Sequence, residues 1–373
     1  DGSQWVCSKD SPPWNKYAPN ANIITTVDSS TNVAEYTSLT IGSDNLPVIA
    51  YQDNFNADLK VAKCNDPACS SSTITVVDSV GDVGAYTSIA IGTDGNPIIS
   101  YFDNTNNDLK FVKCGNISCS SGNIIRTIDS TDSVGLFTSI IIKLDGNPVI
   151  SYYDATNDNL KVAECNDQSC SNADLITFSS ANDRGSYSSI AIGVGGDFAI
   201  SYADNTSGEL LYKYCDEGSC ESVSTSTIGS FEGKYSSIAF GEDSLPIIAA
   251  YDSNDGLYVG KCITLRCNSD PTIKPITGSG FEGSHLSLAI GNDGFPVMSY
   301  YGQNLDLKIA KCFDYNCNIK YDVTIDSDGN VGRATSIAVG SDGLPVISYR
   351  DFTNGNLKVA KCGSPTCNEN WTQ

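Results

Sequence analysis

The strongest constraint on this chain is a repeat of about 50 residues that occurs seven times. Its clearest copy runs from Tyr86 to Cys119 and reads YTSIAIGTDGNPIISYFDNTNNDLKFVKCGNISC. The copies follow one another at steps of 50, 51, 50, 47, 50 and 50 residues, counted on the first cysteine of each: Cys64, Cys114, Cys165, Cys215, Cys262, Cys312 and Cys362. A period of about 20 to 50 residues is typical of solenoids, propellers and arrays.

Each repeat contains four short segments with the pattern of β-strands. The first, TSIAIG, alternates large Ile with small Ser, Ala and Gly, and the turn signal Asp94-Gly95 separates it from IISYFD, which Pro97 opens. DLKFVKC and NIIRTID supply the third and fourth strands, and no segment has helical length or spacing. We therefore predict an all-β fold, a seven-bladed β-propeller with four antiparallel strands per blade. A parallel β-helix is the alternative, but its turns are usually shorter and rarely contain such hairpins.

The two ends of the chain are predicted to close the ring. Residues 22–28 (NIITTVD) match the fourth-strand segments, whereas the last repeat has only three clear strands. We expect the N-terminal strand to complete the last blade and to remove exposed edges. Pairing with the next molecule, head to tail, is the alternative and would propagate as a fibre. The predicted organisation is an N-terminal extension (1–21) and one propeller (22–373) with repeats ending near Cys69, Cys119, Cys170, Cys220, Cys267, Cys317 and Cys367.

Cysteine spacing predicts the redox environment. Fourteen of the 15 cysteines form C-x4-C pairs, and we predict seven disulfides: Cys64–Cys69, Cys114–Cys119, Cys165–Cys170, Cys215–Cys220, Cys262–Cys267, Cys312–Cys317 and Cys362–Cys367. Such bonds indicate a secreted, extracellular or cell-surface protein, here a processed mature form. Metal binding is disfavoured because zinc sites use closer cysteine pairs and His285 is the only histidine. Cys7 has no partner in this scheme, which suggests an intermolecular bond or a free thiol.

Composition limits the partners. The net charge is −22 and the sequence pI is about 4.2, which disfavours nucleic acids and anionic membranes because both attract basic surfaces. The sequence contains no run of 18 apolar residues, so no membrane-spanning helix is predicted. No cofactor is predicted. A Ca²⁺ site at residues 103–108 (DNTNND) is only weakly indicated, because the run lacks the glycine and the distal glutamate of an EF-hand loop.

Two rings of side chains are predicted to meet on one rim of the propeller. One ends the second strands: Asp53, Asp103, Asp154, Asp204, Asp252, Gly302 and Asp351. The other begins the first strands: Tyr36, Tyr86, Phe137, Tyr187, Tyr235, His285 and Ala334. The aspartates and tyrosines are predicted to bind a carbohydrate or a cation, since aromatic faces pack on sugars and carboxylates accept hydroxyl hydrogen bonds. The alternatives are that aspartate accepts backbone N–H groups within its turn and that tyrosine fills the channel.

No catalytic constellation emerges from the sequence. A sialidase would need converging arginines, and only Arg184, Arg333 and Arg350 fall on this rim, the first at a different blade boundary. A Ser–His–acid relay could use only His285. The prediction is therefore that the chain is not an enzyme.

The repeat TSIAIG-x-DG-x-P-x-ISYYD…LKVAKC-x4-C resembles repeat units in secreted bacterial and archaeal β-propeller proteins, and the resemblance covers nearly all of residues 22–367. It implies the fold and carries no residue-level activity. The predicted function is a non-enzymatic, secreted structural or adhesive module that can self-assemble through its N-terminal segment or Cys7. The alternative is a soluble lectin that binds cell-surface glycans at the Asp/Tyr rim.

Overall fold

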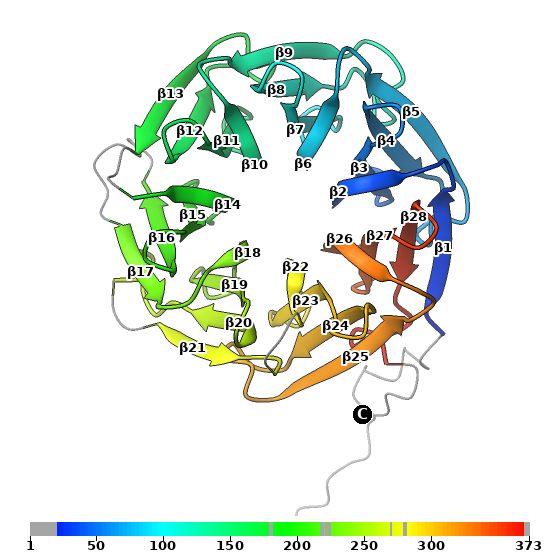
Figure 1. Ribbon diagram of the computed structural model, residues 1–373. Coiled ribbons are helices and arrows are strands. Elements are labelled where there is room, and N and C mark those ends of the chain that lie inside the picture. The colour runs from blue at the N-terminus through cyan, green and yellow to red at the C-terminus, as the bar shows by residue number, and fades with distance from the viewer. Residues whose placement is uncertain are drawn as a thin grey trace, which may run out of the picture.

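The computed structural model describes residues 21–178, 182–216, 220, 225–268, 271–278 and 282–368. Seven four-stranded antiparallel sheets stand like blades around a central channel (Figure 1). This confirms the predicted all-β, seven-bladed propeller. Within the described ranges, no helix is long and apolar enough to cross a membrane.

Each blade contributes one strand to each of four concentric positions. The innermost strands are β2 (Val33–Ile41), β6 (Val83–Ile91), β10 (Val134–Ile142), β14 (Arg184–Ile192), β18 (Lys234–Phe240), β22 (Ser284–Ile290) and β26 (Val331–Val339). The second strands are β3 (Pro47–Asp53), β7 (Pro97–Asp103), β11 (Pro148–Asp154), β15 (Phe198–Asp204), β19 (Pro246–Asp252), β23 (Pro296–Tyr301) and β27 (Pro345–Asp351). The third strands are β4 (Asp58–Cys64), β8 (Asp108–Lys113), β12 (Asn159–Cys165), β16 (Glu209–Cys215), β20 (Gly256–Lys261), β24 (Leu307–Cys312) and β28 (Asn356–Lys361). The outermost strands are β5 (Ser72–Asp78), β9 (Ile124–Asp129), β13 (Ala173–Phe178), β17 (Thr225–Gly229), β21 (Thr272–Pro275), β25 (Lys320–Asp326) and β1 (Ile23–Asp28). We number blades 1 to 7 from the blade of β2 to the blade of β26.

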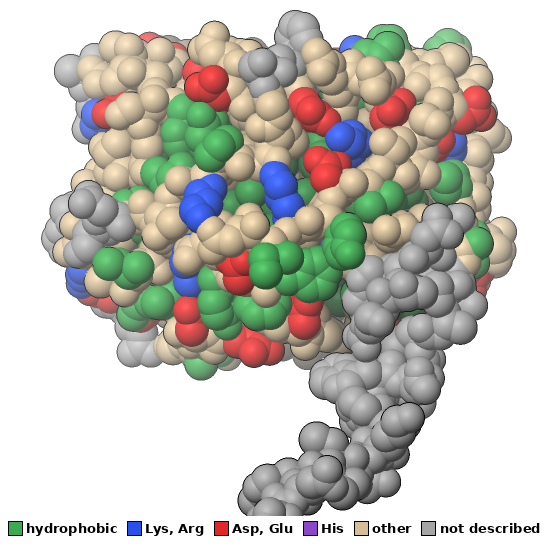
Figure 2. Space-filling view, turned by 90° about the horizontal axis from the view of Figure 1, so that it is seen from below, with side chains coloured by type: hydrophobic (Ala, Val, Ile, Leu, Met, Phe, Trp, Pro, Cys, Tyr) green, Lys and Arg blue, Asp and Glu red, His purple; other side chains and the backbone are tan. Residues whose placement is uncertain are grey.

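Burial explains why these segments form strands in this order. Every residue of β7 is buried, because neighbouring blades cover both faces of a second strand. The outermost strand β9 instead alternates between exposed and less exposed residues, since only one face meets another blade. Seen edge-on from below, the outer surface carries groups of hydrophobic side chains among scattered charged ones (Figure 2). Ile263, Ile319 and Tyr321 are among the exposed hydrophobic residues of blades 5 and 6.

The N-terminal strand closes the ring within one chain. β1 pairs antiparallel with β28, from Ile23 opposite Lys361 to Asp28 opposite Leu357, and the two strands lie side by side in Figure 1. Asn22 extends this contact: its Nδ2 donates to the Cys367 carbonyl (2.8 Å), and its Oδ1 accepts from the Gly363 N–H (3.0 Å). The predicted completion of the last blade is confirmed.

All seven predicted disulfides are present, with Cα–Cα distances of 4.6 to 5.1 Å. Each closes a loop after a third strand, as the spacing predicted. They are consistent with an oxidising compartment. Cys7 lies outside the described residues.

Backbone hydrogen bonds to serine side chains link the innermost strands into a closed ring. One serine Oγ in each blade accepts a backbone N–H from the next blade at 3.0 to 3.3 Å: Ser38, Ser88, Ser139, Ser189, Ser237, Ser287 and Ser336. The serine in the TS dipeptide of the repeat therefore forms a contact between neighbouring blades. These bonds hold the channel wall at a fixed spacing.

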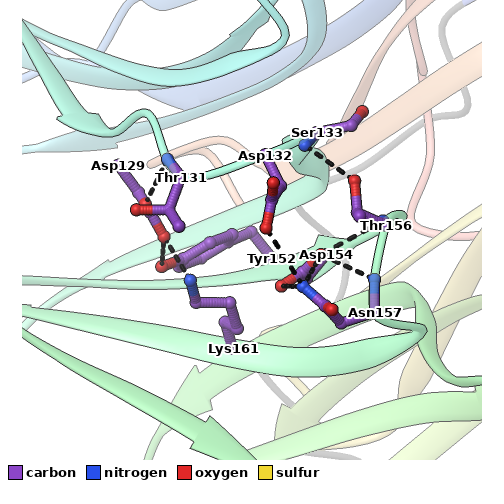
Figure 3. Close-up of polar contacts among 9 residues, drawn as sticks. All are labelled: Asp129, Thr131, Asp132, Ser133, Tyr152, Asp154, Thr156, Asn157 and Lys161. Atoms are coloured by element: carbon purple, nitrogen blue, oxygen red, sulfur yellow. Dashed lines mark hydrogen bonds and ion pairs between the residues drawn. The ribbon is translucent and has the colours of Figure 1, made fainter.

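A buried Asp–Tyr–Lys cluster joins neighbouring blades further out. In Figure 3, Asp129 at the end of β9 accepts from the Tyr152 hydroxyl (2.8 Å) and the Lys161 ammonium (2.5 Å) of blade 3. The same cluster occurs at four boundaries: Asp28 with Tyr51 and Lys60, Asp78 with Tyr101 and Lys110, Asp129 with Tyr152 and Lys161, and Asp326 with Tyr349 and Lys358. Paired and hydrogen-bonded in this way, the charges can be buried without a large penalty.

Candidate functional site

The two rims of the propeller differ in what they carry. One rim holds the turns between second and third strands, such as the turn after Asp103; we call it the Asp-turn rim. The loops that enter the innermost strands lie beside these turns, as the bond from the Asn104 N–H to the Asp82 carbonyl (2.8 Å) shows. The opposite rim holds the Asp-Gly turns and the disulfide loops; we call it the cysteine rim.

The predicted aromatic ring surrounds the channel mouth on the Asp-turn rim. Neighbouring rings lie 4.3 to 4.9 Å apart between centroids, in the order Tyr36, Tyr86, Phe137, Tyr187, Tyr235 and His285. Ala334 occupies the seventh position and leaves a gap on the side of blade 7. Together they line a hollow of about 360 Å³. The structure therefore brings the four predicted tyrosines into one contiguous surface.

A repeated backbone irregularity aims these side chains at the channel. All six aromatic residues have φ between 51° and 55°, a left-handed conformation that is uncommon for residues other than glycine. In β6, for example, the pairing register with β7 shifts between Ala85 and Ser88, which marks a β-bulge around Tyr86. Bulges redirect side chains and are frequent beside functional sites. Residues held in such conformations cost of order 1 to 3 kcal/mol each and are also typical of such sites.

Burial disfavours the charged forms of several residues of the aromatic ring. It raises the pKa of Tyr235 to about 12 and that of Tyr36 further still. Burial, and secondarily the charge of Arg333, lower the pKa of His285 to about 4. The mouth therefore offers phenol groups and a neutral imidazole at pH 7.

The predicted aspartate ring takes part in turns. Asp53, Asp103, Asp154, Asp204, Asp252 and Asp351 are only 0 to 4 % exposed. Asp103 is typical: its Oδ1 accepts the N–H groups of Thr105 (2.9 Å) and Asn106 (3.1 Å), and Figure 3 shows the same arrangement at Asp154. This geometry supports the turn-forming alternative, and ligand binding by these residues stays a prediction. Across the described ranges, no group of three or more His, Cys, Asp or Glu residues could hold a metal ion.

Two carboxylates that the sequence analysis did not single out share a pocket on the Asp-turn rim. Glu35 on β2 and Asp82 in the loop before β6 line a hollow of about 270 Å³ between blades 1 and 2. Asn54 donates to Glu35 (3.2 Å), and Gln52 donates to Asp82 (2.8 Å). Glu35 also lines the aromatic mouth. The two hollows thus adjoin at this glutamate.

Blade 7 adds two guanidinium groups to the same side of the mouth. Arg333 on β26 stands opposite Arg350 on β27 in the sheet register. Arg350 forms an ion pair with Glu35 and donates to Asn32 (2.6 Å). Arg333 packs over Phe352, with its guanidinium carbon 4.3 Å from the ring centroid.

The Nε atoms of both arginines are buried and have no hydrogen-bond partner among the described residues. This arrangement leaves Arg333 as a cation at the mouth of an acidic protein. Arg184, which the sequence placed elsewhere on the rim, instead pairs with Asp204 (2.6 Å).

A sequence signal for these residues exists in the departures from the repeat. The residue before the ring position is charged in only three blades: Glu35, Lys234 and Arg333 stand where the others have Ala85, Leu136, Ser186 and Ser284. Consensus reasoning passes over such positions, because it looks for what the repeats share.

Comparison with solved structures shows the fold. The chain is similar to the GH93 α-L-arabinofuranosidase of Fusarium graminearum in complex with arabinobiose (9% identity, 92% of this chain and 97% of that chain, TM-score 0.53). It is also similar to NanB sialidase from Streptococcus pneumoniae (11%, 91% and 69%, 0.51) and to a PL25 ulvan lyase (10%, 90% and 95%, 0.50). No protein-family model matches the chain. No curated protein matches its sequence.

These neighbours correct the functional prediction. The chain was expected to be a non-enzymatic structural or adhesive module, with a lectin as the alternative, yet the neighbouring propellers include glycoside hydrolases, a sialidase and a polysaccharide lyase. The prediction that the chain is not an enzyme is therefore contradicted. It failed because it weighed only a cluster of arginines and a Ser–His–acid relay, and did not consider a pair of carboxylates drawn from neighbouring loops. Since identity is about 10%, the likeness shows the fold, and the activity of this chain is a proposal.

Proposed function

We propose that this chain is a carbohydrate-active enzyme that cleaves glycosidic bonds at the channel mouth of the Asp-turn rim. The observation that carries the proposal is the pair of carboxylates, Glu35 and Asp82, in one pocket beside the aromatic ring. Most enzymes that hydrolyse glycosides use two carboxyl groups on either side of the scissile bond. Among the described residues, this is the place where such a pair adjoins an aromatic surface suited to sugars.

The surroundings suggest different roles for the two carboxylates. Glu35 is paired with Arg350, which favours its ionised form and suits a nucleophile or a base. Asp82 then exchanges the proton with the leaving oxygen, and Gln52 holds its carboxylate in place at 2.8 Å. Tyr36, which lines both hollows, packs against a sugar ring.

Arg333 suggests an acidic sugar as substrate. It brings a positive charge to the mouth of a chain whose net charge is −22, and its buried Nε lacks a partner among the described residues. A carboxylate or sulfate on the sugar would pair with this guanidinium, since guanidinium binds such groups with paired hydrogen bonds. The ulvan lyase among the neighbours is bound to an acidic saccharide, -[GlcA(1-4)Rha3S]-.

Glu35→Gln and Asp82→Asn test the proposal. We expect release of reducing ends from a panel of neutral and acidic polysaccharides to fall at least about 100-fold in either variant, because each removes a proton-transfer group. Asp183→Asn is the matched control: Asp183 occupies the position of Asp82 in blade 4 and accepts from the Tyr153 hydroxyl (2.8 Å). Binding of glycans without turnover by the unaltered protein, or full activity in Glu35→Gln, would refute the proposal.

We also propose that the enzyme acts outside the cell. The seven disulfides support this location, because such bonds persist in oxidising compartments. Polysaccharides of the kind proposed are also too large to enter a cell unaided. Fractionation of the producing cells would test the proposal, and recovery of the oxidised protein mainly from the cytosol would contradict it.

A further inference from the structure

An apolar groove opens on the cysteine rim, on the side of the ring opposite the proposed active site. It lies between blades 6 and 7 and encloses about 470 Å³. Phe295 and Phe313 of blade 6 form one side, and Leu344, Pro345 and Pro365 of blade 7 form much of the other. Nothing in the proposed reaction uses this surface.

Blade 6 is built differently from the other blades at this place. Phe313 directly follows the first cysteine of its repeat, where the other repeats have Asn65, Gly115, Asn166, Asp216, Ile263 and Gly363. Phe295 stands in the turn where the others have Leu46, Asn96, Asn147, Asp197, Leu245 and Leu344. Only this repeat places aromatic side chains at both positions. The groove is therefore a local feature, distinct from the architecture that all blades share.

The floor of the groove is charged but already neutralised. Lys311 is 1 % exposed, and its Nζ donates to Asp293 Oδ1 (2.7 Å) and to the Phe295 carbonyl (3.0 Å). The centroids of Phe295 and Phe313 lie 5.9 and 6.0 Å from this Nζ. The carboxylates of Asp293 and Asp342 stand at the edge, with side chains 39 % and 43 % exposed. An occupant thus meets an apolar interior and acidic acceptors at the rim.

The N-terminal segment leaves the propeller beside this groove. Asn22, which precedes β1, bonds to Gly363 and Cys367, and Pro365 of that same disulfide loop lines the groove. Residues 1–20, which precede the described part of the chain, include Pro12, Pro13 and Trp14. An extended chain covers up to about 3.4 Å per residue, so the eight steps from Asn22 to Trp14 reach about 27 Å.

We propose that Trp14, together with Pro12 and Pro13, docks into the groove between blades 6 and 7 of its own chain. An indole provides a large apolar face for the two phenylalanines, and its N–H can donate to an acidic acceptor at the edge. Once docked, the N-terminal segment would bridge blades 6 and 7, close to the closing strand β1.

Intrinsic fluorescence can test this directly, because the three tryptophans of the chain, Trp5, Trp14 and Trp371, all lie in the terminal segments. Proteins with one tryptophan each are made by replacing the other two with Phe. We expect Trp14 alone to emit at shorter wavelength and to be quenched by acrylamide several-fold less than Trp5. Protection confined to Trp371 would overturn the proposal.

The groove itself is tested with Phe313→Gly, which introduces the residue found in blades 2 and 7 (Gly115 and Gly363). In the Trp14-only protein this change should restore quenching to the level of Trp5. Ile263→Gly, at the same position in blade 5, is the matched control and should have no effect. Protection that survives Phe313→Gly, or that disappears on dilution and so requires a second copy, would refute docking within one chain.

Discussion

His285 shows how one departure from the repeat changes the chemistry of the channel mouth. It follows Tyr235 in the aromatic ring, with 4.6 Å between centroids, and its pKa is lowered to about 4 by burial and then by Arg333. The equivalent position in blade 3 holds Phe137, which cannot titrate. Protonation of His285 therefore places a charge in a buried ring beside a guanidinium.

His285→Phe should make the protein less sensitive to acid. In the unfolded chain histidine has a pKa of about 6.5, so the unfolded state takes up the proton first. The contribution of neutral His285 to the free energy of unfolding is fully present above about pH 6.5 and is lost as the pH falls toward 4, by at most about 3 kcal/mol. Chemical unfolding from pH 7 to 4 measures this. Parallel losses in His285→Phe and the unaltered protein would show that the imidazole does not contribute.

At the scale of elements, the outermost strands bind the next blade in two ways. β5 ends at Asp78, which accepts from Tyr101 (2.7 Å) and Lys110 (2.5 Å). Burial alone would raise the pKa of Asp78, yet the bonds from Lys110 and Tyr101 hold it below its usual value. The outermost strand of blade 3, β13, instead ends at Phe178. In the neighbouring blade 4, Leu211 stands at the position that Lys110 occupies in blade 2.

This contrast predicts the effect of breaking a cluster. Asp78→Asn should lower the free energy of unfolding by about 3 to 5 kcal/mol, because it leaves Lys110 buried with a weakened partner. The double change Asp78→Phe with Lys110→Leu replaces the buried charged pair with two apolar side chains and should cost much less. Equilibrium unfolding in urea compares the three proteins. A double variant as unstable as Asp78→Asn would mean that the cluster contributes more than compensation of charge.

Sequence periodicity predicted the elements better than the site. The spacing of residues such as Cys114 and Pro97 determined blade number, strand order and disulfides, because these recur in every unit. NIITTVD likewise predicted β1. The ring of aspartates to which Asp103 belongs recurs for the same reason, and in the structure these side chains accept hydrogen bonds within their own turns. Glu35 and Asp82 could not be predicted this way, since neighbouring loops bring them together and each lacks counterparts in most repeats.

At the scale of the whole molecule, the ring is uneven. Asp–Tyr–Lys clusters occur at four boundaries: between blades 7 and 1, 1 and 2, 2 and 3, and 6 and 7. The first of them joins β1 to blade 1 through Asp28 and Tyr51 (2.7 Å). β13, β17 and β21 end without an aspartate, which leaves three consecutive boundaries from blade 3 to blade 6 without this cluster. Leu286 also replaces the hydroxyl side chain that in five other blades, as at Thr138, donates to the residue at the ring position of the preceding blade (3.0 Å to Tyr86).

We therefore expect the ring to open first between blades 3 and 6. In native-state hydrogen exchange, amides of β18 and β22 should exchange at least about tenfold faster than those of β2 and β26, because local opening follows the weakest contacts. The first and last strands of the chain, β1 and β28, pair with each other, and no disulfide among the described residues joins them, so this junction is the natural rival for the weakest point. Faster exchange in β1 and β28 than in β18 and β22 would show that strand closure, and not the missing clusters, limits the stability of the ring.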